Sequence, residues 1–241
     1  MNNFTGLIVG ATGLVGSHCL HYLLNDPDYI LVKVLTRRPL NIDHPKLQEH
    51  HLNFEKLAEY HHIIKADHVF CCLGTTIKKA GSQDAFRRVD FDYAYQLARM
   101  ASQNNCRYFL LVSALGANEK SKIFYNRVKG ELEKALAQLP FQSTLIFRPS
   151  LLLGKRRESR PTEKVGEYIL KCLTPFLMGK LKKYRPLQAH ALAMAMVEMA
   201  KVNLNGIHIF ESDKIQFFYE KLKKNMERGI IPSHLAYKKI H

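Results

Sequence analysis

The stretch Gly10-Ala11-Thr12-Gly13-Leu14-Val15-Gly16 decides the fold, because it sets three glycines at intervals of three residues between two apolar segments. Residues 6–9 before it are typical of a buried parallel strand, and residues 14–24 place apolar side chains at helical spacing. The first glycine permits a tight turn, the second lets the backbone approach a pyrophosphate, and the third lets helix and strand pack closely. A helix N-terminus also presents free N–H groups to phosphates. The stretch therefore predicts a dinucleotide-binding turn.

Strand and helix signals alternate along the rest of the chain, and the strands are apolar runs of the kind found in covered parallel sheets. The expected strands are 6–9, 30–35, 47–52, 67–73, 107–112, 143–147 and 207–211. The expected helices are 14–24, 82–104, 125–139, 162–177, 186–201 and 215–226. The sequence predicts an α/β fold with a doubly wound parallel sheet. We expect one domain over 1–212, with a small substrate-side lobe at about 150–212, and a basic helix and tail at 213–241.

The chain has 241 residues and a formal net charge of +15, from 36 Lys and Arg against 21 Asp and Glu. Residues 1–144 carry 17 basic and 13 acidic side chains, so most of the surplus lies behind residue 145. No RNA-binding signature, zinc finger or helix-turn-helix pattern accompanies it, which disfavours nucleic acid as a partner. A solvated basic surface is the favoured interpretation, and an anionic ligand or surface stays open.

Membrane and metal classes find little support in the sequence. No run of about 18 apolar residues exists, so an integral membrane protein is excluded. Residues 168–181 mix apolar and basic side chains, which leaves peripheral contact with an anionic membrane open beside a plainer role as a pocket wall. Twelve His form no HExxH motif and no zinc spacing with Cys, so no metal site is expected.

Five Cys, an odd number, form no CxxC pair and indicate free thiols in a reducing compartment. The first residues show no basic segment ahead of an apolar one, so no signal peptide is expected. We therefore expect a cytoplasmic protein.

The second expected strand ends at Thr36-Arg37-Arg38, with no Asp or Glu at the position that binds the ribose hydroxyls of NAD. A guanidinium pairs in bidentate fashion with a phosphate. The sequence therefore favours NADP(H) over NAD(H), with Arg37 as the favoured contact to the 2′-phosphate and Arg38 beside it. The alternative is an exposed arginine pair with no ligand.

Ser113, Tyr125 and Lys129 form a candidate catalytic triad. Ser113 ends an expected strand, at the sheet edge where ligands bind, and Tyr125 and Lys129 share a helix face four residues apart. Carbonyl reduction by hydride creates an alkoxide that needs a proton donor. A lysine charge lowers the high pKa of a tyrosine, and a serine hydroxyl polarises the substrate oxygen. The alternative for Tyr125 and Lys129 is an ordinary surface pair on a helix.

Seven motifs together resemble the short-chain dehydrogenase/reductases of the atypical, extended-like kind, and most of all the bacterial relatives of the Tat-interacting oxidoreductase-like subgroup. The resemblance covers most of residues 4–212. The motifs are GATGLVG at 10–16, TRRPL at 36–40, FCCLGTT at 70–76, FRRVDFDY at 86–93, FLLVSALGA at 109–117, FYNRVKGELE at 124–133 and FRPSLLLG at 147–154.

The resemblance implies a Rossmann fold, a pyridine nucleotide and the triad roles described above. It also implies that residues 147–150 pass the carboxamide side of the nicotinamide. The expected cofactor contacts beside Arg37 and Arg38 are Gly10, Thr12, Gly13, Leu14, Val15, Gly16, Leu73, Gly74, Thr75, Lys129, Arg148 and Pro149. Relatives of this kind often dimerise through helices, so a homodimer is left open.

Two departures from the family pattern affect the functional interpretation. Many relatives carry Asn where this chain has Asp90, and an Asn-rich turn where it has Cys71-Cys72-Leu73-Gly74. The asparagine that assists a proton relay is therefore not identifiable. The favoured function is an NADP(H)-dependent oxidoreductase acting on a small carbonyl or alcohol, with an anionic substrate left open by Arg148, Arg156, Arg157 and Arg160. The alternative is an NADP(H)-binding regulatory or protein-interaction module with little or no turnover.

Overall fold

The computed structural model describes residues 2–154, 177 and 179–229. The helix expected at 162–177 lies outside this part of the chain, apart from its last residue. Arg156, Arg157 and Arg160 lie outside it as well.

Seven parallel strands form one sheet in the order β3-β2-β1-β4-β5-β6-β9, which confirms the predicted doubly wound Rossmann fold. Ile8 in the central strand pairs with Val34 on one side and Phe70 on the other. The strands are β1 (Phe4–Val9), β2 (Tyr29–Thr36), β3 (Leu47–His51), β4 (His68–Cys71), β5 (Tyr108–Val112), β6 (Ser143–Arg148) and β9 (Gly206–Glu211). Because every neighbouring pair is parallel, the carboxyl ends of all seven strands lie at one edge.

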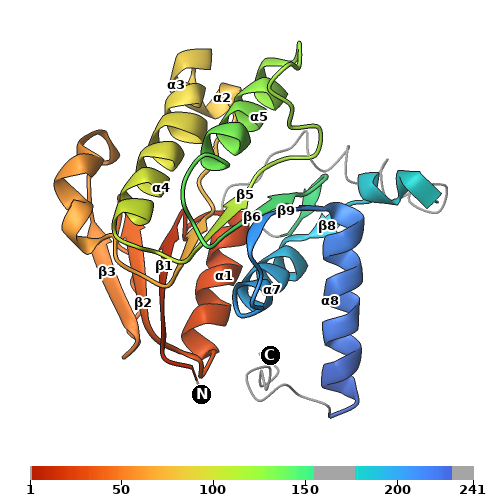
Figure 1. The fold of residues 1–241 in the computed structure, drawn as a ribbon, viewed down its shortest axis with the longest axis horizontal. Helices are drawn as coiled ribbons and strands as arrows, with labels where there is room; N and C mark the ends of the chain where they lie inside the picture. The colour runs from red at the N-terminus through yellow and green to blue at the C-terminus, as the bar shows by residue number, and fades with distance from the viewer. Residues whose placement is uncertain (1, 155–176, 178, 230–241) are drawn as a thin grey trace.

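Helices cover both faces of this sheet (Figure 1). On one face lie α1 (Leu14–Asn25) and α7 (Ala189–Ala200), with α8 (Ser212–Glu227) packed against α7. On the other lie α4 (Tyr93–Gln103) and α5 (Phe124–Leu136). Side chains alternate along each strand, so Ile8 and Phe70 join the core under α1 and α7, whereas Leu7 and Val69 join the core under α4 and α5.

Shorter elements complete the described part. They are η1 (Phe54–Ile63), α2 (Ile77–Ala80), β7 (Leu152–Leu153), η4 (Gly179–Tyr184) and β8 (Leu187–Gln188). The prediction of one helix from residue 186 was wrong at its start, because β8 pairs with β7 before α7 begins. The expected boundary at residue 212 stays a prediction, although Ile215 of α8 belongs to the core under α1 and α7.

The single helix expected over 82–104 is divided into α3 (Gln83–Arg87), a π-helical turn η2 (Arg88–Asp92) and α4. A π turn widens the helix and shifts the face on which later residues lie. A periodicity of 3.6 residues cannot reveal such a turn. The π turn has a local consequence. It places Asp90 in the interior, where this residue is only 1% exposed.

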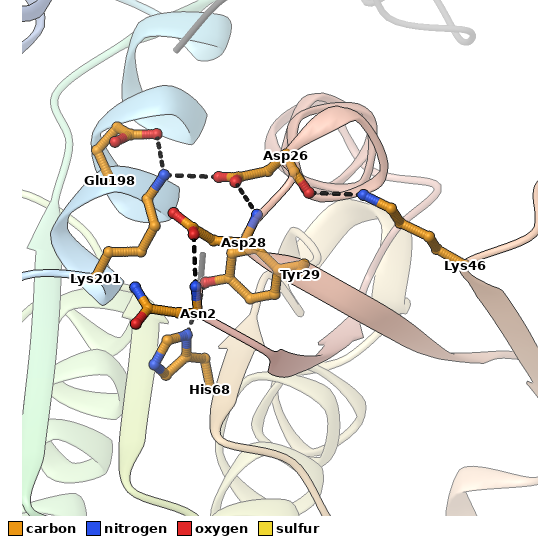
Figure 2. A network of polar contacts seen from close by, with 8 residues as sticks. All are labelled: Asn2, Asp26, Asp28, Tyr29, Lys46, His68, Glu198 and Lys201. Carbon is orange, nitrogen blue, oxygen red and sulfur yellow. Dashed lines mark hydrogen bonds and ion pairs between the residues drawn. The ribbon is translucent and has the colours of Figure 1, made fainter. Parts of the chain in front are cut away.

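A buried polar network joins α1, β2 and α7 at the amino end of the sheet (Figure 2). The Nζ of Lys201, the residue that follows α7, lies 2.6 Å from Asp26 Oδ2 and 2.7 Å from Glu198 Oε1. Lys46 donates to the backbone oxygen of Asp26 at 2.7 Å. Tyr29 shares a hydrogen bond of 2.7 Å with His68. The network holds α7 to the end of α1 far from the carboxyl edge.

The network predicts a pH dependence of stability. Burial raises the pKa of Glu198 to about 7, against the opposing effect of Lys201, and Asp26 adds to the rise. An acid whose pKa is higher in the folded state stabilises the fold at low pH, and that contribution disappears as pH rises from about 4.5 to about 7. Glu198→Gln removes the titrating carboxyl, and with it this pH-dependent contribution to stability, and keeps an oxygen that accepts a hydrogen bond from Lys201. We expect its melting temperature to rise relative to the unmodified chain by roughly 5 °C between pH 5 and pH 8. Melting curves with a constant offset across this range would contradict the prediction.

Candidate functional site

Loops from five strands meet at the carboxyl edge of the sheet, and each carries residues singled out in the sequence. Backbone hydrogen bonds hold neighbouring loops together. Cys72 N–H donates to Val9 O at 3.0 Å, Ser113 N–H to Phe147 O at 2.7 Å, and Leu115 N–H to Pro149 O at 2.9 Å. These backbone hydrogen bonds join neighbouring segments at the carboxyl edge, and the backbone oxygen of Pro149 accepts one of them.

The glycine turn between β1 and α1 is built on close backbone contacts. Gly10 has φ of +78°, and a Cβ there would lie 2.4 Å from the oxygen of Cys72. A Cβ on Gly16 would lie 2.1 Å from the oxygen of Gly10. Gly13 is more open, because its Cβ would meet only that same oxygen, at 3.2 Å. Gly10 thus has the positive φ of a tight turn and also a close contact with Cys72, and Gly16 permits the close packing of α1 on that turn.

The start of α1 is free to receive an anion. Gly13 is its N-cap and supplies no side-chain acceptor, and Thr12 and Gly13 are exposed. The first N–H groups of a helix have no acceptor within the helix. Leu14 is half-buried and Val15 is buried, so these two residues offer backbone groups rather than side chains. The arrangement fits the phosphate-binding role expected from the motif.

At the end of β2, the side chain of Thr36 fixes the turn. Its hydroxyl donates to Arg38 O at 2.8 Å and accepts from Arg38 N–H at 3.3 Å. Arg37 and Arg38 are both exposed beyond this turn. Their guanidinium groups are accessible to a ligand at the carboxyl edge.

The loop after β4 is linked to α5 through Asp90. Thr75 N–H donates to Asp90 Oδ2 at 2.8 Å, and Asp90 Oδ1 lies 2.8 Å from Lys129 Nζ. Leu73 packs against the core beneath this loop, and Gly74 is exposed. The side chains of Asp90 and Lys129 are only 1% and 4% exposed. The pair is therefore a buried ion pair at the heart of the candidate site.

Electrostatics around Lys129 favour its charged form. Burial by itself lowers the pKa of Lys129, but the carboxylate of Asp90, with Tyr125 and Cys71, raises it above the ordinary value of 10.5. Tyr125 lies one turn earlier on α5, is half-buried, and has its ring centroid 5.5 Å from that of Phe86. The structure thus brings Tyr125 and Lys129 together on one helix.

Ser113 and Arg148 meet at a carboxylate that the sequence analysis did not single out. The hydroxyl of Ser113 donates to Glu133 on α5. Arg148 also binds Glu133, with Nη2 at 2.5 Å and Nε at 3.1 Å from Oε2. This hydrogen bonding raises the pKa of Arg148, and Glu133 is only 6% exposed. The roles of Ser113 toward substrate and of Arg148 toward a cofactor stay predictions.

Two further features of the site had weak signals in the sequence. Asp90 occupies the position where many relatives carry Asn, and Glu133 follows Lys129 by four residues on α5, a spacing that places the two side chains on one helix face. Gly130 permits a close approach of α5 to the loop at Asn118, since a Cβ there would lie 2.3 Å from the backbone carbon of Asn118.

No group of three or more His, Cys, Asp or Glu that could hold a metal ion occurs among the described residues. Within the same part of the chain, no helix has the length and apolarity to cross a membrane.

Comparison with known proteins assigns the family. The family described as "NAD dependent epimerase/dehydratase family" matches residues 6–189. The chain belongs to this family. A rat relative, "Protein HTATIP2", is 39% identical over 167 residues, which are 68% of this chain and 69% of the relative. "Protein FMP52, mitochondrial" from Candida albicans is 32% identical over 209 residues, 83% of this chain and 89% of the relative. The predicted resemblance to the atypical, extended-like short-chain dehydrogenase/reductases is thereby confirmed.

Solved structures share the fold of this chain. A UDP-N-acetylglucosamine 4-epimerase from Methanobrevibacter ruminantium, in complex with UDP-N-acetylmuramic acid, aligns with a TM-score of 0.67 and 17% identity, over 94% of this chain and 83% of that one. The Bordetella bronchiseptica enzyme WbmH, in complex with NAD+, aligns with a TM-score of 0.64 and 18% identity, over 97% and 83%. At these identities the likeness concerns the fold of the epimerase/dehydratase family alone.

The expected cytoplasmic location was wrong. Relatives from Candida albicans, Debaryomyces hansenii and Emericella nidulans are named as mitochondrial proteins, with identities of 32%, 32% and 29%. The physical reason is that unpaired thiols indicate a reducing compartment without saying which one. The amino-acid composition of a folded domain does not indicate which reducing compartment contains the protein.

Proposed function

We propose that the chain is an NADP(H)-dependent oxidoreductase that transfers hydride to or from a small carbonyl or alcohol. The observation that carries the proposal is the position of Tyr125 one turn before a buried, charged Lys129 on α5, at the sheet edge that also holds the glycine turn. An acid–base group supported by a fixed cation is what the reduction of a carbonyl needs. The family description, with its NAD dependence, supports this class of reaction.

The residues at the carboxyl edge fit a dinucleotide. Thr12 and Gly13 are exposed beside the uncapped start of α1, where a pyrophosphate would bind. Arg37 would contact a 2′-phosphate, with Arg38 beside it. Leu73, Gly74 and Thr75 would border the cofactor from the loop after β4. Pro149 would border it from the end of β6, together with Arg148, which Glu133 holds in place.

When bound, NADP(H) would supply or accept the hydride. The phenol of Tyr125 would donate a proton to the substrate oxygen, or take it back in the reverse direction. Lys129 would favour the phenolate by its charge and would bind ribose. Ser113 would orient the substrate oxygen. Because the Ser113 hydroxyl donates to Glu133, it would donate to the substrate oxygen only after this hydrogen bond breaks. The proposal assigns no charge to the small substrate, because Arg156, Arg157 and Arg160 lie outside the described residues.

Cofactor titration tests the first part of the proposal. Loss of a charge-assisted contact to phosphate costs about 1.5–3 kcal/mol. Arg37→Ala should therefore weaken NADPH binding by roughly 10-fold to 100-fold and leave NADH binding unchanged. Arg107→Ala is the control, because Arg107 is exposed just before β5, at the opposite edge of the sheet. Equal affinity of the unmodified chain for NADPH and NADH would refute the NADP(H) preference.

Turnover tests the second part. Tyr125→Phe keeps the ring that packs against Phe86 and removes the proton donor. NADPH oxidation with a panel of carbonyl compounds should fall at least ~100-fold, with NADPH affinity unchanged. The alternative function, a cofactor-binding regulatory module, is favoured by the engagement of Ser113 with Glu133. NADPH binding without consumption across the whole panel would support that alternative instead.

A further inference from the structure

Asp90 is a buried carboxylate of the candidate site whose two oxygens contact different segments of the chain. Its two carboxylate oxygens have different partners: Oδ1 lies 2.8 Å from Lys129 Nζ on α5, and Oδ2 accepts from Thr75 N–H at 2.8 Å. Three segments distant in sequence, the loop after β4, the turn η2 and helix α5, are therefore joined through one side chain. The triad of Ser113, Tyr125 and Lys129 does not include it.

A buried ammonium needs such a partner. Transfer of a charge from water to the interior is costly unless an opposite charge compensates it. The groups that influence Lys129 come from three elements: Asp90 from η2, Tyr125 from α5 and Cys71 from β4. Burial raises the pKa of the Cys71 thiol to about 12, so this thiol is neutral near pH 7. Of these three groups, only Asp90 is a carboxylate.

The position of Asp90 depends on the π-helical turn. Asp90 lies in the middle of η2 and is 1% exposed, whereas Asp92, at the end of the same turn, is exposed. π turns inside helices are frequent at functional sites because they redirect a side chain. Here the redirected side chain points at the lysine.

We propose that Asp90 is a positioning residue, which keeps Lys129 as a charged ammonium at the carboxyl edge and fixes it to the loop after β4. The inference rests on the proposed function only for what Lys129 then does to a ligand. The pairing itself acts in the ligand-free chain. It is therefore tested first without any cofactor.

Two single variants should show opposite pH slopes of stability. Asp90→Asn keeps the acceptor for Thr75 N–H but removes the charge, so burial should lower the pKa of Lys129. A lysine with a lowered pKa destabilises the fold most at low pH, because its protonated form is then trapped in the interior. The melting temperature of Asp90→Asn should lie about 10 °C below that of the unmodified chain at pH 6, with a smaller deficit at pH 9.

Lys129→Met leaves the Asp90 carboxylate buried without its ammonium, so its deficit should grow as pH rises from 5 to 9. The double variant Asp90→Asn with Lys129→Met should recover most of the loss and show no slope, because neither charge remains. If the melting temperatures of the three variants all changed with pH in the same way, the role of Asp90 would be purely steric and the proposal would be overturned. If Asp90→Asn does not fold at pH 6, the slopes of Lys129→Met and of the double variant decide.

NADPH binding then tests the positioning role without turnover. In Asp90→Asn the affinity for NADPH should fall about 10-fold more between pH 6 and pH 9 than in the unmodified chain, as Lys129 loses its proton. Asp92→Asn removes an equal charge from the exposed end of η2 and should follow the unmodified chain. A pH-independent loss in Asp90→Asn would overturn the role toward the ligand. Failure of the unmodified chain to bind NADPH would refute the proposed function, while the ligand-free melting curves would still decide the role of Asp90.

Discussion

Gly16→Ala is expected to lower the melting temperature by about 10 °C and to abolish measurable NADPH binding. An alanine inside a helix is ordinarily more favourable than a glycine, by about 1 kcal/mol. At this position the alanine should instead destabilise the fold, because its Cβ would lie 2.1 Å from the oxygen and 2.7 Å from the carbon of Gly10. Both atoms belong to the backbone, so α1 must move away from the turn. Overpacking of this kind costs about 1–3 kcal/mol or more.

Gly13→Ala provides the matched comparison within the same motif. Its Cβ would contact only the oxygen of Gly10, at 3.2 Å, and Gly13 is exposed. We expect a melting temperature within a few degrees of the unmodified chain, with weaker NADPH binding because the methyl group would occupy the approach to the pyrophosphate. Thermal unfolding followed by circular dichroism and a fluorescence titration with NADPH separate the two effects. A Gly16→Ala protein as stable as the Gly13→Ala protein would show that α1 does not depend on this close contact.

The sheet and the turn were predictable because their signals are local. The apolar runs at 30–35 and 107–112 and the glycine spacing at 10–16 each report on neighbours in sequence, and the structure places them as expected. Residues 54–63 were not predicted as η1, since a 3₁₀ helix lacks the apolar period of an α-helix. The π turn escaped prediction for the same reason.

The partners of the predicted site residues could not be read from the sequence. Lys129 and Tyr125 were found through a spacing of four residues, but Asp90 is 39 residues away from Lys129 in the chain. Ser113 was expected to face a substrate, whereas its hydroxyl donates to Glu133, 20 residues later. Such pairings depend on the relative placement of whole elements across the sheet. One sequence contains no direct signal for them.

The same limit applies to the interpretation of the net charge. A surplus of +15 gives a count of side chains and no information on which of them are compensated. Lys129, Arg148 and Lys201 each contact a carboxylate whose side chain is no more than 6% exposed. These three basic residues belong to the interior ion pairs of the fold. The surplus available to an external anion is carried by other residues.

Lys201→Met should be the most destabilising change at the amino end of the sheet. The variant leaves Asp26 and Glu198, which are 0% and 4% exposed, close together without the ammonium that lies 2.6 Å and 2.7 Å from them. Removal of one partner from a buried ion pair costs about 3–5 kcal/mol. We therefore expect a fall of about 10 °C in melting temperature at pH 8. The deficit should shrink toward pH 5, because protonation removes the repulsion between the carboxylates.

Lys223→Met is the matched control, because Lys223 pairs with Glu227 at 3.7 Å on the surface of α8, where both side chains are 62% exposed. Surface pairs contribute about 0–1 kcal/mol, so this variant should melt within a few degrees of the unmodified chain at every pH. Combining Lys201→Met with Glu198→Gln should restore part of the lost stability at pH 8, since one buried charge then remains instead of two. A Lys201→Met protein that melts like the Lys223→Met control would show that the network in Figure 2 contributes shape rather than charge compensation.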